Sequence, residues 1–547
     1  MHPLPDGGPS STGQSGPTTP PDQSARFTDA LEKVKPLLEA QPPLADHLLA
    51  EALQIAAVSS LGLGLLDDAE SYWRRSIATN PEFVDAYLNL GTLLKGLNRL
   101  HDTEALFRQL LKVRPDLADI QNQLGSMLQD QGRLAEAEAA YRQAALIEPD
   151  RVEFHYNLGV VLRPLGRWCE AAQAYQRAVE LSPGFVMGYS NLGNVLKGLG
   201  RLVEAEAAYR QALAIRGDYH MAKFGLATLL ISMGRFEEGW RLYEERHADP
   251  KSMQHKTQKV INRPPWRGEA LAGKRLLVWQ EGGLGDAIHF GRYFAWLKAQ
   301  GAAEIAFACA PALHRLFATV EGVDVVLAHE AGWASAKNYD YWTSLLSAPL
   351  YMGTTMETIP PPVRLTLDPS LVESWRARLA ALPPDRRIGL VWKGNVQHQN
   401  DANRSLRSLA ELAPLWRIPG VCFVSLQKGA GEDEALAPLA GQIGQVGGQP
   451  LLHLGSDVAD MADSAAIVAQ LDLVICVDTS IAHLAASLGT PCWVMLPAEE
   501  IDWRWMHDRT DSPWYPDTIR LFRQPLGGTW PAVIEQVRQA CAEVFAS

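Results

Sequence analysis

Residues 149–182 read PDRVEFHYNLGVVLRPLGRWCEAAQAYQRAVELS, and this stretch is one period of a pattern that fills the first half of the chain. Prolines recur every 34 residues, at Pro81, Pro115, Pro149 and Pro183. Glycines follow in the same register, at Gly91, Gly125, Gly159 and Gly193. Aromatic residues do the same, at Trp73, Phe107, Tyr141, Tyr175, Tyr209 and Tyr243. A fixed period of this length is typical of helical units that stack one on the next.

The residue types explain how one unit folds. Proline starts a helix after a short turn, glycine lets the two helices of a unit approach, and the aromatic ring fills the gap between units. Arginines open the second helix of each unit, at Arg99, Arg133, Arg167, Arg201 and Arg235. The units ending at Asn80 and beginning at Gly217 are degenerate, as capping units are. The pattern resembles the tetratricopeptide repeat, which implies an all-helical superhelix over residues 26–247.

One polar position of the first helix is an amide in every clear unit, directly before Leu-Gly. Its members are Asn89, Gln123, Asn157 and Asn191. Stacked units place these amides in a row on the concave face, where they can bind the backbone of an extended peptide. O-GlcNAc transferases, which this arm resembles, use a comparable asparagine ladder. The alternative is that each amide bonds to its own loop or to a neighbouring helix.

Composition limits the partners. The formal net charge is −12, which argues against nucleic acid or an anionic membrane surface as the main partner. The longest apolar stretch, Ile55 to Leu66, is too short to cross a bilayer. None of the six cysteines forms a CxxC pair, and several sit in apolar runs, as small buried residues of a reducing compartment do. We therefore expect a cytoplasmic protein without a membrane span.

Two segments lack any helical or strand period. Residues 1–25 are rich in Pro, Gly, Ser and Thr, and we expect a disordered tail. Residues 248–272 form a polar junction, in which Trp266 amid prolines and glycines indicates a docked turn.

The second half changes to short apolar runs separated by amphipathic stretches, which is typical of βαβ units. RLLVW, EIAFACA and VDVVL form one set, and IGLVW, VCFVSL, LDLVICV and PCWVML form another. We predict an α/β region of two Rossmann-like lobes, residues 273–382 and 383–547, with a cleft between them. The last segment, residues 530–545, predicts a closing helix that crosses back onto the first lobe.

The first of three candidate loops follows the strand RLLVW. It reads QEGGLGDAIHF, so Asp286 stands at the start of a helix after a glycine-rich turn. The glycines do not have the GxGxxG register of a dinucleotide site, which disfavours NAD. Asp286 can cap the helix, or it can be a general base at the mouth of the cleft. Sequence alone leaves both roles open.

The second loop, VWKGNVQHQNDANRSL, follows the first strand of the second lobe. It carries Lys393, His398, Asp401 and Arg404, and Lys428 after the next strand can converge on the same place. Such cations can neutralise a diphosphate. For His398 and Asp401 a solvated polar loop is the alternative.

The third loop, VDTSIAHLAASLGTP, carries the strongest signal. Its strand ends at Asp478, and Thr479 and Ser480 start a helix that carries His483. Backbone N–H groups and two hydroxyls at a helix start form a ready anion site. His483 on the first turn can face the phosphates, with a buried core histidine as the alternative.

These loops resemble the heptosyltransferase-like glycosyltransferases of the GT-B fold. The matching motifs occur in the order RPPWRGE, RLLVWQEGGLGD, GLVWKGN, FVSLQKG, DTSIAHLA and DWRWMHDRTDSPWYP. The same order is found in bacterial proteins that fuse tetratricopeptide repeats to this domain, some of which modify flagellin. The resemblance implies Asp286 as base and Asp478, Thr479, Ser480 and His483 as the donor-phosphate element. Ser480 stands where heptosyltransferases usually carry Gly, so the donor sugar stays open.

The last motif, residues 502–516, is unusually aromatic, with Trp503, Trp505, Trp514 and Tyr515. Its rings can stack on a nucleobase or sugar, or they can pack as a wedge between the lobes.

The combined prediction is a glycosyltransferase that moves a sugar from a nucleotide-sugar to Ser or Thr of a protein held by the repeats, with flagellin as a candidate acceptor. No DxD motif follows a strand in the second half, which favours an inverting route without a metal or other cofactor. Two alternatives stay open: a glycan or lipid acceptor, and a scaffold that binds nucleotide without catalysis.

Overall fold

The computed structural model describes residues 21–41, 44–248, 253–383, 385–398, 400–436 and 444–545. Two compact units make up the chain, residues 1–183 and 184–547. Most of the expected tail, residues 1–20, lies outside the described residues. Residues 21–25, which we also expected in the tail, open a helix instead.

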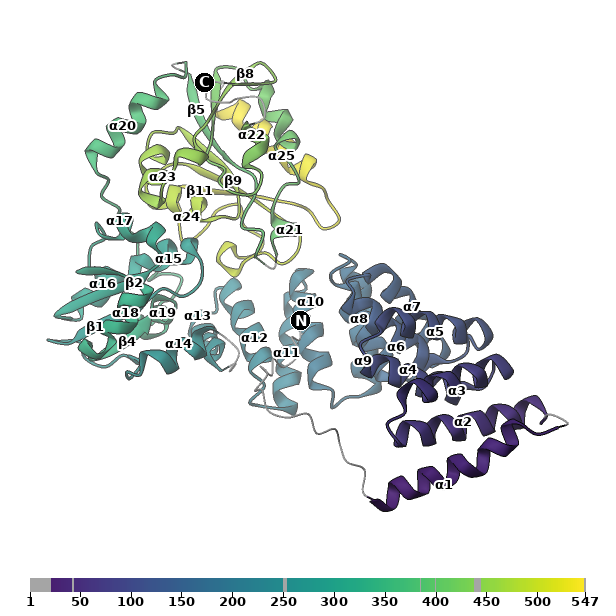
Figure 1. Ribbon diagram of the computed structural model, residues 1–547. Helices are drawn as coiled ribbons and strands as arrows, with labels where there is room; N and C mark the ends of the chain where they lie inside the picture. The colour runs from purple at the N-terminus through teal and green to yellow at the C-terminus, as the bar shows by residue number, and fades with distance from the viewer. Residues whose placement is uncertain are drawn as a thin grey trace. The chain divides into compact units, whose positions relative to one another are not determined.

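The regular elements described in the first unit are all helices (Figure 1). Its helices are α1 (Pro21–Leu38), α2 (Asp46–Gly62), α3 (Leu66–Thr79), α4 (Val84–Gly96), α5 (Leu100–Val113), α6 (Ala118–Asp130), α7 (Leu134–Ile147), α8 (Val152–Leu162) and α9 (Trp168–Leu181). The second unit begins with four more repeat helices, α10 (Val186–Gly198), α11 (Leu202–Ile215), α12 (His220–Ser232) and α13 (Phe236–Tyr243). The predicted helical repeats are confirmed.

The recurring glycine is required by the recurring ring. A Cβ built on Gly125 would lie 2.7 Å from the ring of Tyr141, and one on Gly193 would lie 2.8 Å from the ring of Tyr209. Both tyrosines are buried. Only glycine therefore lets the second helix bring its ring this close to the first.

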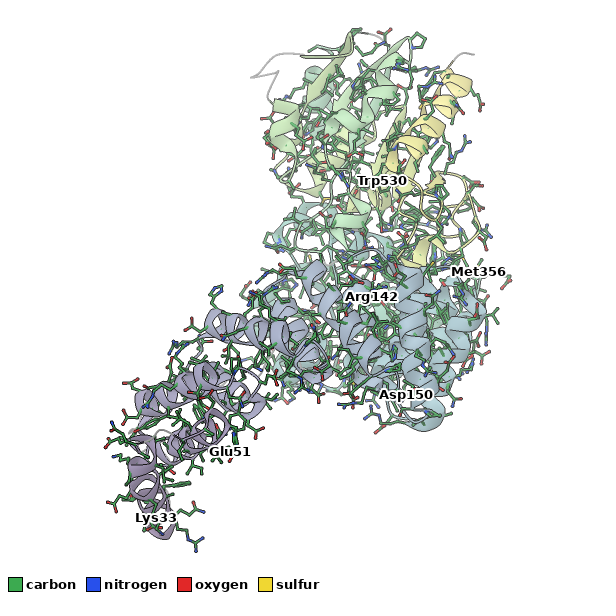
Figure 2. All side chains as sticks on the ribbon, turned by 90° about the vertical axis from the view of Figure 1, so that its right-hand side faces the viewer. Lys33, Glu51, Arg142, Asp150, Met356 and Trp530 are labelled. Carbon is green, nitrogen blue, oxygen red and sulfur yellow. The ribbon has the colours of Figure 1, made fainter. Side chains whose placement is uncertain are left out.

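The arginine that recurs in each repeat joins neighbouring repeats. Arg133 donates to Glu104 of the preceding unit at 2.7 Å and to Glu136 of its own helix at 2.8 Å. Arg142, labelled in Figure 2, makes the matching pair with Glu138 and Glu170. Single exposed pairs contribute little, but a network repeated along the stack adds up and fixes its register.

The junction is more ordered than its composition predicted. A short 3₁₀ helix, η1 (Glu244–His247), ends the repeats, and a helix, α14 (Met253–Ile261), follows within residues 248–272. The expected absence of regular structure there is wrong. Trp266 is buried, its backbone N–H donates to Trp342 O at 2.7 Å, and its indole N–H donates to Glu269 O at 2.7 Å. The docked turn is confirmed.

The first lobe holds a parallel sheet in the order β3-β2-β1-β4. Its strands are β1 (Arg275–Trp279), β2 (Glu304–Cys309), β3 (Val325–Ala328) and β4 (Tyr341–Ser344). Its helices are α15 (Leu284–Phe290), α16 (Phe294–Ala299), α17 (His314–Phe317), α18 (His329–Ser335) and α19 (Ala348–Met352). Three strands were predicted; β4 was missed.

The second lobe holds a sheet in the order β11-β10-β9-β5-β6-β8-β7. Its strands are β5 (Arg386–Val391), β6 (Val421–Ser425), β7 (Gly444–Val446), β8 (Gln449–His453), β9 (Leu473–Val477), β10 (Cys492–Leu496) and β11 (Ile519–Arg523). Strand β7 pairs antiparallel with β8, and the other pairings described in this sheet are parallel. Its helices include α21 (Asp401–Arg404), α22 (Glu432–Leu436), α23 (Met461–Val468) and α24 (Ser480–Ser487). Without β7, the strands follow the doubly wound order 3-2-1-4-5-6. The predicted fold class is confirmed.

Two helices lie elsewhere than predicted. Helix α20 (Pro369–Leu379), placed by the boundary at residue 382 with the first lobe, packs on α23, where Trp375 donates to Asp463 at 3.1 Å. The closing helix α25 (Trp530–Phe545) packs against β11 and the 3₁₀ segment η6 (Leu409–Arg417) of the second lobe. The expected crossing onto the first lobe is wrong.

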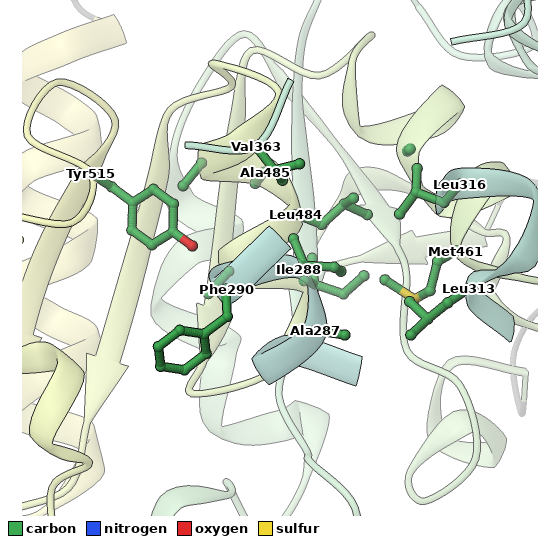
Figure 3. Packing of buried hydrophobic residues seen from close by; sticks show 14 of the residues in the cluster. Ala287, Ile288, Phe290, Leu313, Leu316, Val363, Met461, Leu484, Ala485 and Tyr515 are labelled. Carbon is green, nitrogen blue, oxygen red and sulfur yellow. The ribbon is translucent and has the colours of Figure 1, made fainter. Parts of the chain in front are cut away.

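The two lobes share one apolar core with the last repeat. Figure 3 shows Ala287 and Ile288 of α15 beside Leu484 and Ala485 of α24. An aromatic wedge, defined as Trp503, Trp505, Trp514 and Tyr515, belongs to the same core and is buried. Trp240 of α13 meets Trp503 edge to face at 5.4 Å and Trp514 at 6.3 Å. The last repeat helices are therefore part of the α/β body.

Trp240→Ala tests whether this contact stabilises the second unit. Removing a fully buried tryptophan leaves a cavity, and we expect the free energy of unfolding to fall by about 3–5 kcal/mol. Chemical denaturation followed by near-ultraviolet circular dichroism measures it. Trp333→Ala is the control, because Trp333 is 41% exposed and should cost much less. Equal losses of unfolding free energy in the two variants would contradict a stabilising contact between Trp240 and the aromatic wedge.

Candidate functional site

All three predicted loops leave the carboxyl ends of central strands in the second unit. Loop 280–286 follows β1, the 391–406 loop follows β5, and loop 478–480 follows β9. In each sheet the strand order reverses there, between the parallel neighbours β1 and β4 and between the parallel neighbours β5 and β9. Ligands of doubly wound sheets bind at such switch points.

Asp286 bridges the two lobes. One carboxylate oxygen accepts from the Gly283 N–H at 2.7 Å, which caps α15. The other accepts from Arg504, which follows β10 in the second lobe. A Cβ on Gly282 would overlap Asp286 Oδ2 at 2.3 Å, and Gly282 has φ +81°. The helix-cap role is thus present, and it does not exclude a role as base.

Arg504 is the central residue that sequence reasoning missed. It is 7% exposed and also pairs with Asp502 at 2.9 Å. Its guanidinium lies 4.3 Å from the ring of Trp503, and its Nε has no partner among the described residues. The signal was available as an Asp-x-Arg sequence inside the aromatic motif. A buried cation with one unused donor can accept an anion.

The start of α24 holds the strongest predicted element. Asp478 ends β9, and burial together with the nearby charge of Asp502 raises the pKa of its carboxyl to about 6. Thr479 is the N-cap residue, but its hydroxyl is buried without a partner among the described residues. The helix start therefore has an unused hydroxyl and a carboxyl that readily takes up a proton.

His483 lies one turn into α24 and is almost fully buried. Its ring stacks on Trp505 at 5.2 Å, with 10° between the planes. Burial, helped by the positive charge of Arg504, lowers the pKa of His483 to about 3. Gly285 explains the close packing, because a Cβ there would lie 3.0 Å from His483 Cδ2 and 3.2 Å from Ser480 Cα. His483 is therefore a neutral imidazole at physiological pH.

The β5 loop contributes one of its predicted cations. Arg404 donates to Asp401 at 3.4 Å. Its positive charge partly offsets the rise in the pKa of Asp478 that burial and Asp502 cause. Burial lowers the pKa of His398, while Arg404, Asp502, Asp401 and Asp286 all act on it electrostatically. Arg404 and His398 therefore belong to the charge cluster around Asp286 and Asp502.

The two predicted lysines are engaged in other contacts. Lys393 pairs with Glu434 of α22, and a Cβ on Gly431 would lie 2.8 Å from Lys393 Cδ. Lys428 donates to the backbone carbonyl of Val458 and is exposed. The predicted convergence of Lys428 on Arg404 is not found in the free protein, because its ammonium donates to the Val458 carbonyl and forms no contact with Arg404 among the described residues.

A second buried ion pair ties the last repeat to the first candidate loop. Arg246 of η1 donates to Glu281 at 2.7 Å and to the Ser347 hydroxyl at 2.6 Å. Both charged side chains are 6% exposed. Removing one partner of such a pair leaves the other charge buried and unpaired, which lowers the free energy of unfolding by about 3–5 kcal/mol. This contact, too, was missed by sequence reasoning.

The aromatic motif packs as a wedge. Its four large rings are buried against α13, α15 and α24, so they have no face free for a nucleobase. Arg509 of the same motif pairs with Asp511 at 2.7 Å. Of the two interpretations left open, the interlobe wedge is the one that the burial supports.

The four amide side chains are half-buried, and two of them form hydrogen bonds with side chains of neighbouring helices. In the first unit, Gln123 accepts from Lys95 Nζ at 2.9 Å, and Asn157 donates to Asn122 at 2.9 Å. Asn89 lies on α4 of the same unit, whereas Asn191 lies on α10 of the second. The neighbour-bonding alternative therefore holds for Gln123 and Asn157 in the free protein.

Three further properties of the chain concern metal ligands, membrane spans and cysteines. Within the described ranges, no group of three or more His, Cys, Asp or Glu side chains is arranged to hold a metal ion. Among the same residues, no helix has the length and hydropathy of a bilayer span. All six cysteines are free thiols, and Cys169 alone is exposed.

Comparison with known proteins confirms the repeats. Tetratricopeptide-repeat families match residues 90–148, 122–184 and 187–217. Protein FlbA of Caulobacter vibrioides is 31% identical over 326 residues, which cover 56% of this chain and 53% of that protein. The chain thus spans about half the length of this curated relative.

Two solved structures are similar to about a third of the chain. YrrB, described as a TPR protein with an unusual peptide-binding site, is 21% identical, with a TM-score of 0.31 over 34% of this chain and 97% of its own. MamA is 18% identical, with a TM-score of 0.30 over 34% of this chain and all of its own.

Asp478→Asn tests the raised pKa. A folded-state pKa above the ordinary one means that the protonated form stabilises the fold at low pH, and that this contribution is lost as the pH rises through 6. Asparagine mimics the protonated form, so the variant should melt at a higher temperature at pH 8 and match the wild type at pH 4. Thermal melts across this range measure the difference.

Asp460→Asn is the control with the opposite sign. Arg315 and two backbone N–H groups lower the pKa of Asp460, so this variant should melt lower at pH 8. A lower melting temperature for Asp478→Asn at pH 8 would show that its carboxylate is stabilised rather than strained.

Proposed function

We propose that this chain is an inverting glycosyltransferase that moves a sugar from a nucleotide-sugar to a Ser or Thr hydroxyl of a protein acceptor. The diphosphate binds at the start of α24, Asp286 is the base, and the repeats recruit the acceptor. The observation that carries the proposal is the meeting of Asp286 from one lobe with the Asp478–His483 element of the other. Gly285 packs directly on Ser480 and His483.

The site can stabilise a leaving diphosphate with the groups it has. Helix N-termini bind phosphate through backbone N–H groups, and the Thr479 hydroxyl is unused there. Arg404 and Arg504 supply positive charge beside it. Fixed donors aimed at developing negative charge are the largest single source of rate in many enzymes.

The reaction balances with these residues alone. Asp286 takes the proton of the acceptor hydroxyl as the oxygen attacks the sugar C1. The bond from C1 to the phosphate oxygen breaks on the opposite face, and the nucleoside diphosphate leaves with that electron pair. Attack from one face and departure from the other invert the anomeric carbon.

This mechanism requires Asp286 to leave Arg504. In the free protein both carboxylate oxygens already accept hydrogen bonds, one from Gly283 and one from Arg504, so the oxygen on Arg504 is not free to accept from an acceptor hydroxyl. An incoming diphosphate offers Arg504 a stronger anion and can draw it from Asp286. Donor binding would in this way free the base.

The same pairing supports a second candidate, a nucleotide-binding scaffold without catalysis. There Arg504 would hold Asp286 permanently as a structural partner. Release of free sugar from a nucleotide-sugar distinguishes the two, because a scaffold binds the donor and leaves it intact. A thermal-shift screen of nucleotides identifies the donor class first, since a ligand of the native state raises the melting temperature.

The acceptor assignment rests on the repeats and on the resemblance. An arm of this length exceeds what a small acceptor requires, and stacked repeats present extended binding surfaces. Flagellin is the acceptor to test first, because the similar repeat fusions include flagellin-modifying enzymes. A glycan or lipid acceptor would make the repeats an assembly device.

Asp286→Asn tests the base. The amide can still cap α15 but cannot take a proton, so we expect transfer to fall by about 10²–10⁴-fold. Nucleotide affinity, measured by calorimetry, should change less than about fivefold, roughly 1 kcal/mol. Asp324→Asn in the same lobe is the control, since Asp324 only bonds Lys298 and the β2 backbone. Near-normal turnover in Asp286→Asn would leave Asp286 a helix cap.

Asn89→Ala combined with Asn157→Ala tests recruitment. Loss of two backbone-binding amides should weaken capture of the acceptor by about 10-fold or more, because each hydrogen bond is worth about 1 kcal/mol. Hydrolysis of the nucleotide-sugar in the absence of acceptor should be unchanged. Gln176→Ala is the matched control, an exposed amide on the second helix of a unit. Unchanged capture by the double variant would exclude the amide row as the acceptor site.

A further inference from the structure

A buried tyrosine hydroxyl lies between two histidines at the boundary of the lobes. Tyr515 Oη is 3.1 Å from His289 Nδ1 and 3.2 Å from His483 Nδ1. Tyr515 is 1% exposed, His289 is 0% exposed and His483 is 6% exposed. The three side chains come from the aromatic motif, α15 and α24, so this contact crosses from one lobe to the other.

Both imidazoles are neutral. Burial, with the positive charges of Arg292 and Arg504, holds the pKa of His289 well below its ordinary value. The pKa of His483 is lowered to about 3 by the same kind of burial and by Arg504 and Arg292, against a weaker opposing effect of Asp502. Within the described part of the chain, the remaining electrostatic effect on His289 comes from His483 itself.

Counting protons restricts the arrangement to two choices. A phenol has one proton to donate, and it can accept with its oxygen. Two other side chains act on Tyr515, Arg292 and Ser487. Arg292 can only donate, and Ser487 Oγ is outside hydrogen-bond geometry with any described residue, so the phenol proton has only the two rings to go to. One ring then accepts that proton and the other donates an N–H to the phenol oxygen. The two histidines are therefore opposite tautomers.

The surroundings of His289 determine which of the two rings donates to Tyr515 and which accepts from it. Its other nitrogen, Nε2, is buried and has no partner among the described residues. An unpaired buried N–H is rarer and more costly than an unpaired acceptor. His289 therefore carries its proton on Nδ1 and donates to Tyr515, and Tyr515 donates to His483. Arg292, whose guanidinium lies 4.8 Å from the Tyr515 ring, favours electron density on that oxygen.

We propose that His289 and Tyr515 are positioning residues that fix His483 as the tautomer with its proton on Nε2, making His483 a neutral hydrogen-bond donor to an anion at the start of α24. The anion part rests on the proposed function; the tautomer does not. Helix side chains lean towards the helix N-terminus, and His483 Cδ2 and Ser480 Cα flank the same point of Gly285. The Nε2–H therefore lies on the side of the ring that faces Ser480.

This arrangement separates donor binding from pH. A histidine that bound phosphate as imidazolium would lose affinity as the pH rose through its pKa. A histidine held neutral, with its proton fixed on the outer nitrogen, keeps the same hydrogen bond across that range.

The test is long-range proton–nitrogen correlation NMR on the full chain labelled with ¹⁵N-histidine, with His483→Gln and His289→Gln to assign the signals. We expect His483 to show a protonated Nε2 and a bare Nδ1 from pH 5.5 to 8, and His289 to show the reverse. Tyr515→Phe should convert His483 to a mixture of tautomers. Tyr293→Phe is the matched control, because Tyr293 is equally buried but bonds Thr354.

The outcomes separate the two proposals. A proton on Nδ1 of His483, a titration of its signals between pH 5.5 and 8, or an unchanged spectrum in Tyr515→Phe would each overturn the relay. Added inorganic pyrophosphate should shift the His483 Nε2–H signal equally at both ends of the pH range, and no shift would overturn the donor role. If the protein meets all these expectations but turns over no nucleotide-sugar, the proposed glycosyltransferase activity is refuted and the proposed tautomer of His483 still stands.

Discussion

The structure of the second unit depends on the burial of one guanidinium. Arg504 neutralises Asp502 beside it and Asp286 across the lobes, and it lies against the rings of Trp503 and Phe290. A buried cation is tolerated only where carboxylates surround it, so the loops that supply those carboxylates must meet. The same requirement brings the capped start of α15 to the start of α24. The geometry of the candidate site thus follows from pairing the buried charge of Arg504 with the carboxylates of Asp286 and Asp502.

Most of the fold could be predicted because its signals are local and repeated. The repeat period fixed the register of every clear unit, and the strands β1, β5, β6, β9 and β10 are continuous apolar runs, as strands buried on both faces are. Strand β4 was missed because YWTS is short and half polar. Helix α14 was missed because it is short and its sequence, MQHKTQKVI, is polar on average.

The site was predicted in part for a related reason. Asp286, Asp478, Thr479, Ser480 and His483 stand next to strand ends, and the chain order alone predicts where strand ends meet. Arg504 and Arg246 could not be found in this way, because the partners that bring them to the site, Asp286 and Glu281, are distant in sequence and meet them only through the packing of lobes and repeats. Lys428 shows the converse: a strand end predicts the edge of the sheet but not the direction of a long side chain.

The wedge has a consequence for building hybrid proteins from this chain. The sequence suggests an exchangeable arm that ends near residue 247, where the repeat register stops. The compact units divide instead between Pro183 and Gly184, and Trp240 and Arg246 belong to the α/β body. A chimera that grafts foreign repeats at 247 would leave the wedge and Glu281 without partners. Joining at 183 keeps α10–α13 with the lobes, so the modular boundary lies inside the repeat array.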